Sequence, residues 1–395
     1  MSIKLSARVQ AVKPSPTLAI TARAAALRAE GKDVIGLGAG EPDFDTPEHI
    51  KSAAWKAITK GMTKYTAVDG TATLKKAIID KFERDNQFVY KPDQILVSCG
   101  GKQSFYNLAQ AVLDPGDEVI IPCPYWVSYP DMTILAGGLP VFIHTNAESS
   151  FKITAAQLRG ALTDKTRLVV INSPSNPSGM EYSMEELREL GDVLKDFPNV
   201  LVATDDMYEH IRWSDTPFVN ILNACPELVD RTMVLNGVSK AYSMTGWRIG
   251  YAAGPVDVIR AMKKIQSQST SNPTSVSQYA AEAALEGDQG CIQEMLEHFK
   301  QRHDYVVDRL NKMPGIECLP SDGTFYVFPS VQGVIDRIDG VNNDLDLAEL
   351  LIEKAGVALV PGSAFGTGGH VRISIATSME NLEKALDRIE RIIPG

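Results

Sequence analysis

The chain has 395 residues, 44% of them hydrophobic and 22% charged, and its formal net charge is -10 at pH 7. A chain of this length can form two domains, or one large domain with a smaller companion. Because the charge is acidic and no run of basic residues occurs, neither a nucleic-acid surface nor an anionic-membrane surface is expected.

The first residues lack the apolar core of a signal peptide, and no apolar run is long enough to span a bilayer. The five cysteines are scattered and form no CxxC pair, which is typical of reduced thiols. The six histidines show no metal-binding spacing, so no metal is predicted. We therefore expect a cytoplasmic protein that binds neither membranes nor nucleic acid.

Three helices are predicted before the first strand. The first ends at Gly31, and the second covers residues 46–61. In the second helix Thr46 is a candidate cap, and Pro47 suits the first helical position. The third helix has apolar residues at helical spacing on its inner side: Leu74, Ala77, Ile78 and Phe82.

Between residues 94 and 254, short runs rich in Val, Ile and Leu alternate with helical segments. The runs are "QILVSCG", "DEVIIP", "RLVVINSP", "VLVATDD", "RTMVLNG" and "RIGYAAG". Runs of this kind are typical of strands buried on both faces of a mostly parallel sheet that helices cover. One intervening helix opens with a capping box, Ser183 and Glu186.

After about residue 290 the pattern changes to a long charged helix, several short apolar runs and a terminal helix. This pattern predicts a smaller α/β domain, which the N-terminal segment is expected to join. The predicted boundaries are an N-terminal arm at 1–15, a small domain made of 16–45 and 291–395, and a large domain at 46–290.

The strand ends of this predicted sheet carry unusual residues, and ligands of open α/β sheets gather at the carboxyl ends of the strands. In "SCGGKQ" the backbone at Gly100 and Gly101 opens a helix, where free N–H groups favour a phosphate; a simple tight turn is the alternative. Lys102 opposes the helix dipole there unless an anion is close, or it is an ordinary solvated lysine.

Two further strand ends carry aromatic and amide side chains. Trp126 follows the second strand, where it can stack on a flat heterocycle or belong to a core. Asn172 and Asn176 lie in a proline-rich turn after the third strand, which either aims their amides outward or needs them for the turn alone.

The fourth strand ends in Asp205 and Asp206, with Tyr208 close behind. A carboxylate beside an apolar strand needs a cationic or hydrogen-bonding partner, although an acidic surface pair or a metal ligand are alternatives. Arg372 interrupts a strand of the smaller domain, either as an edge-strand charge or as a fork for a carboxylate.

The stretch "VLNGVSKAYSMTGWRIGYAAGP" places Lys240 after a buried strand, where a charge is costly, and Arg248 shortly after it. Taken together, the strand ends supply a buried amine, an acid, a stacking ring, a phosphate cradle and a carboxylate fork. Pyridoxal phosphate requires such a set, because it binds through a lysine Schiff base, a protonated ring nitrogen and a phosphate.

The sequence resembles the class I pyridoxal-phosphate-dependent aminotransferases from about residue 5 to its end, and within them the prokaryotic aspartate aminotransferase subgroup. The motifs that carry the resemblance are "AGEPDFDTP", "KYTAVDG", "GGKQ", "PYWVSYP", "NSPSNPSG", "DDMYEH", "GVSKAYSMTGWRIG" and "HVRISIATS". The resemblance implies fold type I, in which helices cover a mostly parallel seven-stranded sheet and a smaller α/β domain is attached.

The resemblance also implies roles around the cofactor ring. Lys240 corresponds to the Schiff-base lysine, and Asp205 to the acid that pairs with the ring nitrogen. Tyr208 and Asn176 correspond to the residues that hydrogen-bond the phenolic oxygen, and Trp126 to the stacking ring. The catalytic residues implied are Lys240, Asp205 and Tyr208, with Lys240 moving the proton between the substrate and the cofactor.

For the cofactor phosphate, the implied ligands are Arg248, Ser239 and the backbone of Gly101, Lys102 and Gln103. Many relatives have a serine three residues before the lysine, whereas this chain has Gly237. Tyr65 resembles the tyrosine that reaches the phosphate in the neighbouring subunit, which implies a homodimer.

For the substrate, Arg372 corresponds to the fork that binds the α-carboxylate, with backbone from Gly40. The implied substrate-binding residues also include Trp126, Asn176, Lys13 on the arm, and Lys102. In the subgroup the lysine of "GGKQ" contacts the distal carboxylate, so L-aspartate with 2-oxoglutarate is the expected pair, in a ping-pong reaction.

Several alternatives stay open at this point. Prephenate, aromatic or alanine specificity would use the same fold and cofactor, and a β-eliminating lyase would also keep Lys240. A ligand-sensing module without catalysis would normally be attached to a DNA-binding segment, and a dehydrogenase would need the dinucleotide fingerprint, which the sequence lacks.

Overall fold

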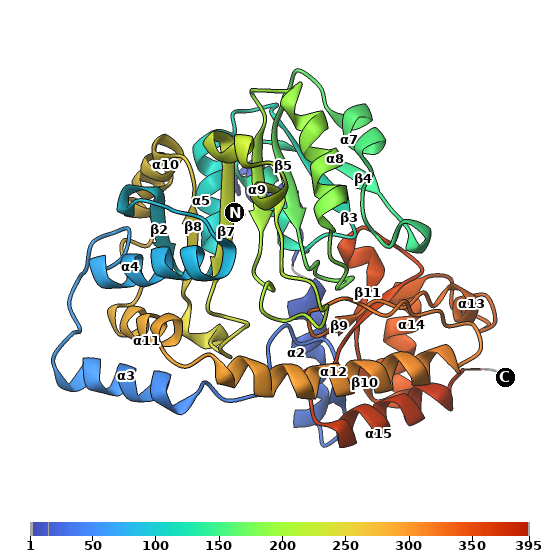
Figure 1. Ribbon diagram of the computed structural model, residues 1–395. Helices are drawn as coiled ribbons and strands as arrows, with labels where there is room; N and C mark the ends of the chain where they lie inside the picture. The colour runs from blue at the N-terminus through green and yellow to red at the C-terminus, as the bar shows by residue number, and fades with distance from the viewer. Residues whose placement is uncertain (1–2, 15, 394–395) are drawn as a thin grey trace.

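The computed structural model describes residues 3–14 and 16–393, and its largest sheet has seven strands in the order β2-β8-β7-β6-β5-β3-β4 (Figure 1). The strands are β2 (Ile95–Ser98), β3 (Glu118–Cys123), β4 (Leu139–His144), β5 (Thr166–Asn172), β6 (Leu201–Asp205), β7 (Thr232–Gly237) and β8 (Gly250–Ala253). All neighbouring pairs are parallel except those of β8, which runs antiparallel to β2 and β7. The predicted fold class is confirmed.

Each strand except β4 coincides with one of the apolar runs predicted to be strands. Every residue of β2, β7 and β8 is buried, as expected for strands covered on both faces. Sequence reasoning did not single out β4, although residues 139–143 are apolar; the strand lies at the edge of the sheet and most of its residues are at least partly exposed. Pro140 lies inside this run, and a proline, which removes a hydrogen-bond donor from the ladder, weakens the signal for a strand.

Helices cover both faces of this sheet (Figure 1). One core packs the sheet against helices that include α3 (Glu48–Thr59), α4 (Ala72–Lys81), α8 (Met184–Lys195) and α11 (Ser275–Glu286), and α7 (Ala155–Ala161) and α9 (Ile221–Ala224) extend it. On the opposite face a second core packs against α5 (Gly101–Val112), α6 (Ser128–Leu135) and α10 (Val256–Ser267).

The predicted helix starts were partly right. Ser183 and Glu186 form the predicted capping box of α8. In α3, by contrast, Pro47 is the cap residue, and no side chain caps the helix. The hydroxyl of Thr46 donates instead to the carbonyl of Ser243, 2.7 Å away. The prediction for Thr46 was wrong because a contact with a segment distant in sequence takes its hydroxyl.

A second group of elements lies at the lower right of Figure 1. In it β1 (Ile35–Gly36) pairs in parallel with β10 (Val357–Ala358), and β11 (Val360–Pro361), β12 (Val371–Ser374) and β9 (Tyr326–Val327) form an antiparallel sheet. The helices of this group are α2 (Pro16–Ala29), α12 (Gly290–Asn311), α13 (Gln332–Ile335), α14 (Asp344–Leu350) and α15 (Met379–Glu390). The β1–β10 pair therefore joins an N-terminal segment of the chain to a C-terminal one.

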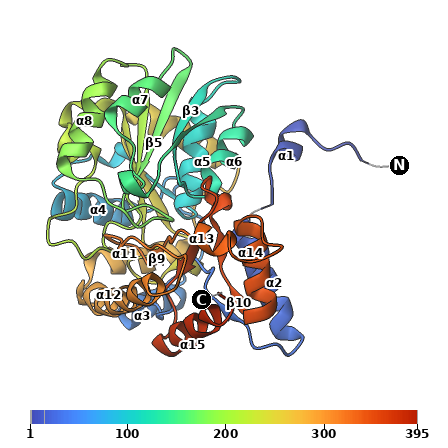
Figure 2. The same ribbon diagram turned by 90° about the vertical axis from the view of Figure 1, so that its right-hand side faces the viewer.

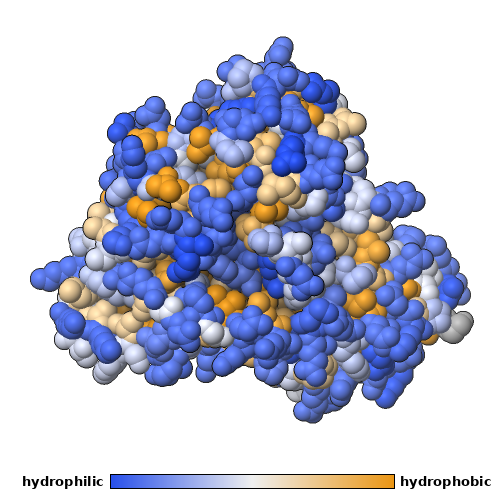
Figure 3. Space-filling view, in the orientation of Figure 1, coloured by the Kyte–Doolittle hydropathy of each residue, from blue (hydrophilic) through white to orange (hydrophobic). Residues whose placement is uncertain are grey.

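The N-terminal arm carries α1 (Ala7–Ala11), which projects from the body of the molecule in Figure 2 and approaches it at α6. No residue of α1 is buried. Residues 1, 2 and 15 of the predicted arm lie outside the described residues. On the face shown in Figure 3, hydrophilic residues cover most of the surface and apolar residues form separate patches. Among the described helices, none has the length and hydropathy that a membrane crossing requires.

Candidate active site

A cavity of about 440 Å³ opens where β5, β6 and β7 end, and residues of the second group of elements line its other side. Parallel strands bring their carboxyl ends to one edge of a sheet, so this is the expected place for a ligand. Most of the predicted site residues line the cavity: Gly40, Gly101, Lys102, Trp126, Asn176, Asp205, Tyr208, Ser239, Lys240, Arg248 and Arg372. Three others do not: Lys13, Tyr65 and Gln103.

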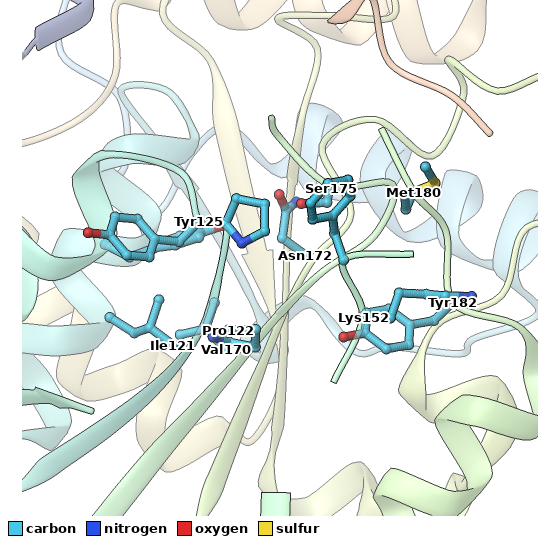
Figure 4. A pocket seen from close by; sticks show the side chains of 12 residues that line it. Ile121, Pro122, Tyr125, Lys152, Val170, Asn172, Ser175, Met180 and Tyr182 are labelled. Carbon is cyan, nitrogen blue, oxygen red and sulfur yellow. The ribbon is translucent and has the colours of Figure 1, made fainter. Parts of the chain in front are cut away.

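A much smaller cavity, of about 20 Å³, lies near the ends of β3 and β5. In Figure 4 Asn172 and Ser175 lie between Tyr125 on one side and Met180 on the other. Its volume is that of about one water molecule, so it is too small for a substrate. Another cavity, of about 430 Å³, is lined by residues such as Arg84, His210 and Phe218 and by none of the predicted site residues. The 440 Å³ cavity, which gathers most of those residues, is therefore the candidate active site.

Lys240 follows the buried strand β7, and its side chain enters the large cavity. Its Nζ donates to the carbonyl oxygen of Gly40, 2.5 Å away. Burial, with a further contribution from the positive charge of Arg372, lowers the pKa of Lys240 to about 8. Both effects disfavour the charged ammonium, so a neutral, nucleophilic amine is accessible close to neutral pH.

The lowered pKa predicts how the cofactor-free protein reacts with an aldehyde. Only the neutral amine attacks, so the rate should rise with pH and level off above about 8, the pKa of Lys240. Replacing Arg372 with leucine should move this midpoint upwards, because it removes a nearby positive charge. The check is the rate of aldehyde capture, measured by absorbance across a pH series. A midpoint near 10.5, the ordinary lysine value, would contradict the assignment.

Asp205 ends β6, and two donors hold its carboxylate. The hydroxyl of Tyr129 donates to Oδ2 at 2.5 Å, and the backbone N–H of Met207 donates to Oδ1 at 3.3 Å. Burial raises the pKa of Asp205, while these two hydrogen bonds and the charge of Lys240 oppose the rise. The neighbouring Asp206 is fully buried and accepts a hydrogen bond from Thr204. It therefore stabilises the interior and does not line the cavity.

Sequence reasoning missed Tyr129. It lies on α6 and is fully buried, with its ring 5.1 Å from that of Trp126 in an edge-on arrangement. Trp126 precedes the helix, so its spacing from Tyr129 is not a helical one and gave no signal. Its contact with Asp205 crosses from α6 to β6, and no local pattern predicts that contact.

The start of α5 has the open backbone that the predicted anion cradle requires. Gly100 has φ +90°, and a side chain on it would lie 2.4 Å from the Arg248 guanidinium, so only glycine admits that close approach. Among the described residues, the backbone N–H groups of Gly101 and Lys102 have no hydrogen-bond acceptor. Gln103 is different, because its N–H donates to the Gly100 carbonyl at 3.0 Å and its side chain binds Cys99 and Thr270.

Arg248 is held over this cradle by its backbone and by its own hydrogen bonds. Its φ of +58° lies in the left-handed region, which non-glycine residues seldom adopt. Its guanidinium donates to the carbonyls of Thr245 at 2.8 Å and Cys99 at 3.3 Å. The unpartnered amides and this guanidinium together suit a phosphate.

The structure explains the glycine at position 237. A side chain on Gly237 would lie 3.0 Å from the backbone of Gly250 and 3.1 Å from the methyl carbon of Met207. The Met207 side chain thus occupies space that a serine at 237 would need. The nearby Ser239 is buried and lines the cavity, so its hydroxyl remains available there.

Arg372 lies on β12, the central strand of its sheet, and is only 2% exposed. The edge-strand alternative is therefore wrong. The guanidinium lies between the rings of Tyr326, at 4.3 Å, and Phe365, at 4.9 Å. It donates to Asn176 Oδ1 at 2.9 Å and to the Gly38 carbonyl at 2.8 Å. Its buried Nε has no partner among the described residues, so this N–H is left to donate to a carboxylate.

The two asparagines of the proline-rich turn differ. Asn172 stabilises the turn itself, because its amide binds the backbone of Asp205 and of Asn176 at 2.9 Å and 2.8 Å. Asn176 is bound to Arg372 and lines the cavity. Tyr208 is also buried there, with its hydroxyl 3.2 Å from that of Tyr326, and burial raises its pKa, which keeps it a neutral donor.

Lys102 extends over the ring of Trp126, with Nζ 5.3 Å from the ring centroid. Burial lowers the pKa of Lys102, and Arg248 adds to the effect. The hydroxyl of Thr17, which sequence reasoning missed, also lines this cavity and has no partner among the described residues. Lys13 is exposed and lies beside Asp131, whose pKa is raised by burial and lowered in part by Lys13.

Comparison with known proteins agrees with this geometry. Residues 32–389 match the family model described as aminotransferase class I and II. The chain is 61% identical to the aspartate/prephenate aminotransferase of Nitrosomonas europaea, covering 99% of this chain and 100% of that protein. It is 49% identical to the aspartate aminotransferase of Geobacillus stearothermophilus, with 99% of each covered.

Solved structures give the same result. The aspartate aminotransferase of Rhizobium meliloti superposes with a TM-score of 0.96 at 50% identity, covering 99% of this chain and 98% of that one. The aspartate aminotransferase of Thermus thermophilus with maleate gives a TM-score of 0.93 at 42% identity, covering 99% and 100%.

The fold and the cavity define a transferase of fold type I that depends on pyridoxal phosphate. The residues present fit this cofactor: a buried amine at Lys240, a carboxylate at Asp205, and unpartnered N–H groups below Arg248. The chain belongs to the class I and II aminotransferase family, whose members act on amino acids and 2-oxo acids.

Proposed function

We propose that this protein transfers the amino group of L-aspartate to 2-oxoglutarate, giving oxaloacetate and L-glutamate by a ping-pong mechanism. One observation carries the proposal: the same cavity is lined by the buried guanidinium of Arg372 and by the ammonium of Lys102. Two cations suit a substrate with two carboxylates. The names of the relatives in Geobacillus stearothermophilus and Rhizobium meliloti, both aspartate aminotransferases, support it.

Pyridoxal phosphate supplies a carbonyl for the lysine and an electron-withdrawing ring. Lys240 would hold the cofactor through its carbonyl carbon, and the Lys240 amine would carry the proton from the substrate Cα to that cofactor carbon. Asp205, held by Tyr129 and by the Met207 amide, would keep the proton on the ring nitrogen. Tyr208 would donate to the phenolic oxygen of the cofactor.

The remaining cofactor contacts divide between ring and phosphate. We assign Asn176 to the phenolic oxygen, next to Tyr208, and Trp126 to the face of the ring. The phosphate ligands that we propose are the amides of Gly101 and Lys102 with the side chains of Ser239 and Arg248. The assignment of Gln103 to the phosphate stays a prediction, since the N–H and the side chain of Gln103 already have partners.

Arg372 and the backbone of Gly40 bind the substrate α-carboxylate in this proposal, with Asn176 and Trp126 beside them, and Lys102 binds the distal one. Lys13 is proposed near the cavity mouth, on the exposed arm. A second acceptor is prephenate, because the Nitrosomonas europaea relative is named an aspartate/prephenate aminotransferase. Aromatic and alanine specificity remain the less favoured alternatives.

The test of the reaction is the first half of the cycle, run with L-aspartate and no acceptor. The absorption of the bound cofactor should change from its aldehyde-derived form to its amine form, with one oxaloacetate released per site. Repeated release of a 2-oxo acid without acceptor would indicate a lyase instead. A spectrum that responds to another amino acid but not to aspartate would mean that the protein is specific for that amino acid and not for aspartate.

Replacing Lys102 with alanine should weaken L-aspartate far more than apolar amino acids. The loss of one charge-assisted contact costs about 1.5–3 kcal/mol, so the KM for aspartate should rise roughly 10- to 100-fold. The measurement is kcat/KM for L-aspartate and for L-alanine in the variant, with Lys312→Ala, a change at an exposed lysine that pairs with Asp308 outside the cavity lining, as the matched control. Equal losses for both amino acids would assign Lys102 to the phosphate or to the scaffold.

We also propose a homodimer in which Tyr65 reaches the neighbouring site. Tyr65 lies on the surface, 92% exposed, and does not line its own cavity. The neighbouring Trp55 and Met62 on and after α3 are exposed as well, at 67% and 42%, which suits an interface. Sedimentation equilibrium should give twice the chain mass of 43.0 kDa. A cytoplasmic location remains our expectation, and the five cysteines, all free, suit it.

The predicted boundaries of the arm, the small domain and the large domain are retained as a proposal: 1–15, then 16–45 with 291–395, then 46–290. The seven-stranded sheet falls within the proposed large domain, and β1 pairs with β10 inside the proposed small one. Small-domain closure over the substrate would exclude water from the reaction.

A further inference from the structure

Tyr326 lies at the junction between the carboxylate fork and the hydroxyl of Tyr208. It belongs to β9, which pairs with β12, the strand of Arg372, through the register Ser374–Tyr326. Its side chain is 1% exposed and lines the active-site cavity. Its ring lies 4.3 Å from the Arg372 guanidinium, and its hydroxyl is 3.2 Å from that of Tyr208.

Gly40 and Phe325 also lie close to Tyr326, in addition to Arg372 and Tyr208. A side chain on Gly40 would lie 3.1 Å from the Tyr326 hydroxyl, so glycine at 40 leaves this hydroxyl room. Phe325 packs against both tyrosines, 5.7 Å from the ring of Tyr208 and 4.7 Å from that of Tyr326. The hydroxyl is therefore fixed by packing.

We propose that Tyr326 is a positioning residue that couples occupation of the Arg372 fork to the hydrogen bond that Tyr208 makes at the cofactor. The proposal rests on the roles proposed above for Tyr208 and Arg372. A phenol has one O–H, so when Tyr208 donates to the cofactor its oxygen can only accept from Tyr326. Hydrogen bonds in such a chain strengthen one another in a buried site.

The charge of Arg372 acts on this chain of hydrogen bonds. Burial raises the pKa of Tyr326, and the guanidinium of Arg372 opposes the rise, which makes its O–H a better donor. When a substrate carboxylate pairs with Arg372, this effect is reduced. Tyr326 then donates less strongly to Tyr208, and Tyr208 donates less strongly to the phenolic oxygen.

The test is a spectrophotometric pH titration of the bound cofactor in the holoenzyme, without substrate. Replacing Tyr326 with phenylalanine should raise the pKa of the bound cofactor by roughly 0.5 to 1, because the weakened donation from Tyr208 stabilises the anionic oxygen less. Tyr90→Phe is the matched control: Tyr90 is a buried tyrosine whose hydroxyl has no partner among the described residues and which does not line the cavity. This control should leave the pKa unchanged.

A double-mutant cycle with Tyr208→Phe makes the test specific. In that background, Tyr326→Phe should change the pKa by no more than about 0.2, because the coupling through the hydroxyl is already lost. An unchanged pKa in Tyr326→Phe alone, or an equal shift with and without Tyr208, would overturn the proposal.

A second experiment repeats the titration with saturating maleate, an unreactive dicarboxylate. Maleate should raise the pKa of the bound cofactor in the unaltered protein, and by a smaller amount in Tyr326→Phe. A rise of the same size in both proteins would show that the coupling does not pass through Tyr326. If maleate leaves the unaltered protein unchanged, the proposed dicarboxylate specificity fails, while the substrate-free comparison still decides the role of Tyr326.

Discussion

Replacing Lys240 with alanine is expected to lower kcat by at least about 10⁴-fold, the upper end of what general acid–base catalysis supplies. Lys240 is proposed both to bind the cofactor covalently and to move the proton from the substrate Cα, and alanine removes both functions. The steady-state rate with L-aspartate and 2-oxoglutarate is the first measurement. The absorption spectrum should also show cofactor that is bound without its link to the protein.

Lys312→Ala provides a matched control, because Lys312 is an exposed lysine at the end of α12 that pairs with Asp308. Its activity should equal that of the unaltered protein. A small primary amine added to Lys240→Ala should restore part of the activity by supplying a base. Near-normal turnover in Lys240→Ala without an added amine would contradict the whole assignment.

Replacing Asp205 with asparagine is expected to reduce kcat by roughly 10²- to 10⁴-fold. The change removes the charge that would face the ring nitrogen but keeps the shape of the side chain between Tyr129 and Met207. Leaving a charged partner buried and uncompensated costs about 3–5 kcal/mol, which corresponds to this loss of rate. The affinity for the cofactor, measured by fluorescence titration, should fall less than kcat.

Tyr129→Phe separates charge from positioning. It leaves the carboxylate of Asp205 charged but removes the hydrogen bond to Oδ2, so its effect on kcat should be much smaller than that of Asp205→Asn. Similar losses in the two variants would mean that the orientation of the carboxylate matters more than its charge. A mild effect of Asp205→Asn would mean that another acid holds the ring proton.

The sequence by itself determined the fold class and most of the cavity. Buried strands leave continuous apolar runs, and a helix cap such as Ser183 with Glu186 is read from adjacent residues, so these elements are encoded locally. Lys240 and Asp205 stood out because a charge beside a buried strand is costly without a purpose. The order of the strands then brought these residues to one edge of the sheet.

Only the tertiary structure decided which side chains are free to act. Thr46, Asn172 and Gln103 looked like a cap or like site residues, but partners distant in space or along the backbone already bind their polar groups. Tyr129 and Tyr326 gave no sequence signal, because their contacts join segments far apart in the chain. A hydrogen bond between elements depends on how those elements pack, and packing is a property of the whole fold rather than of any local pattern.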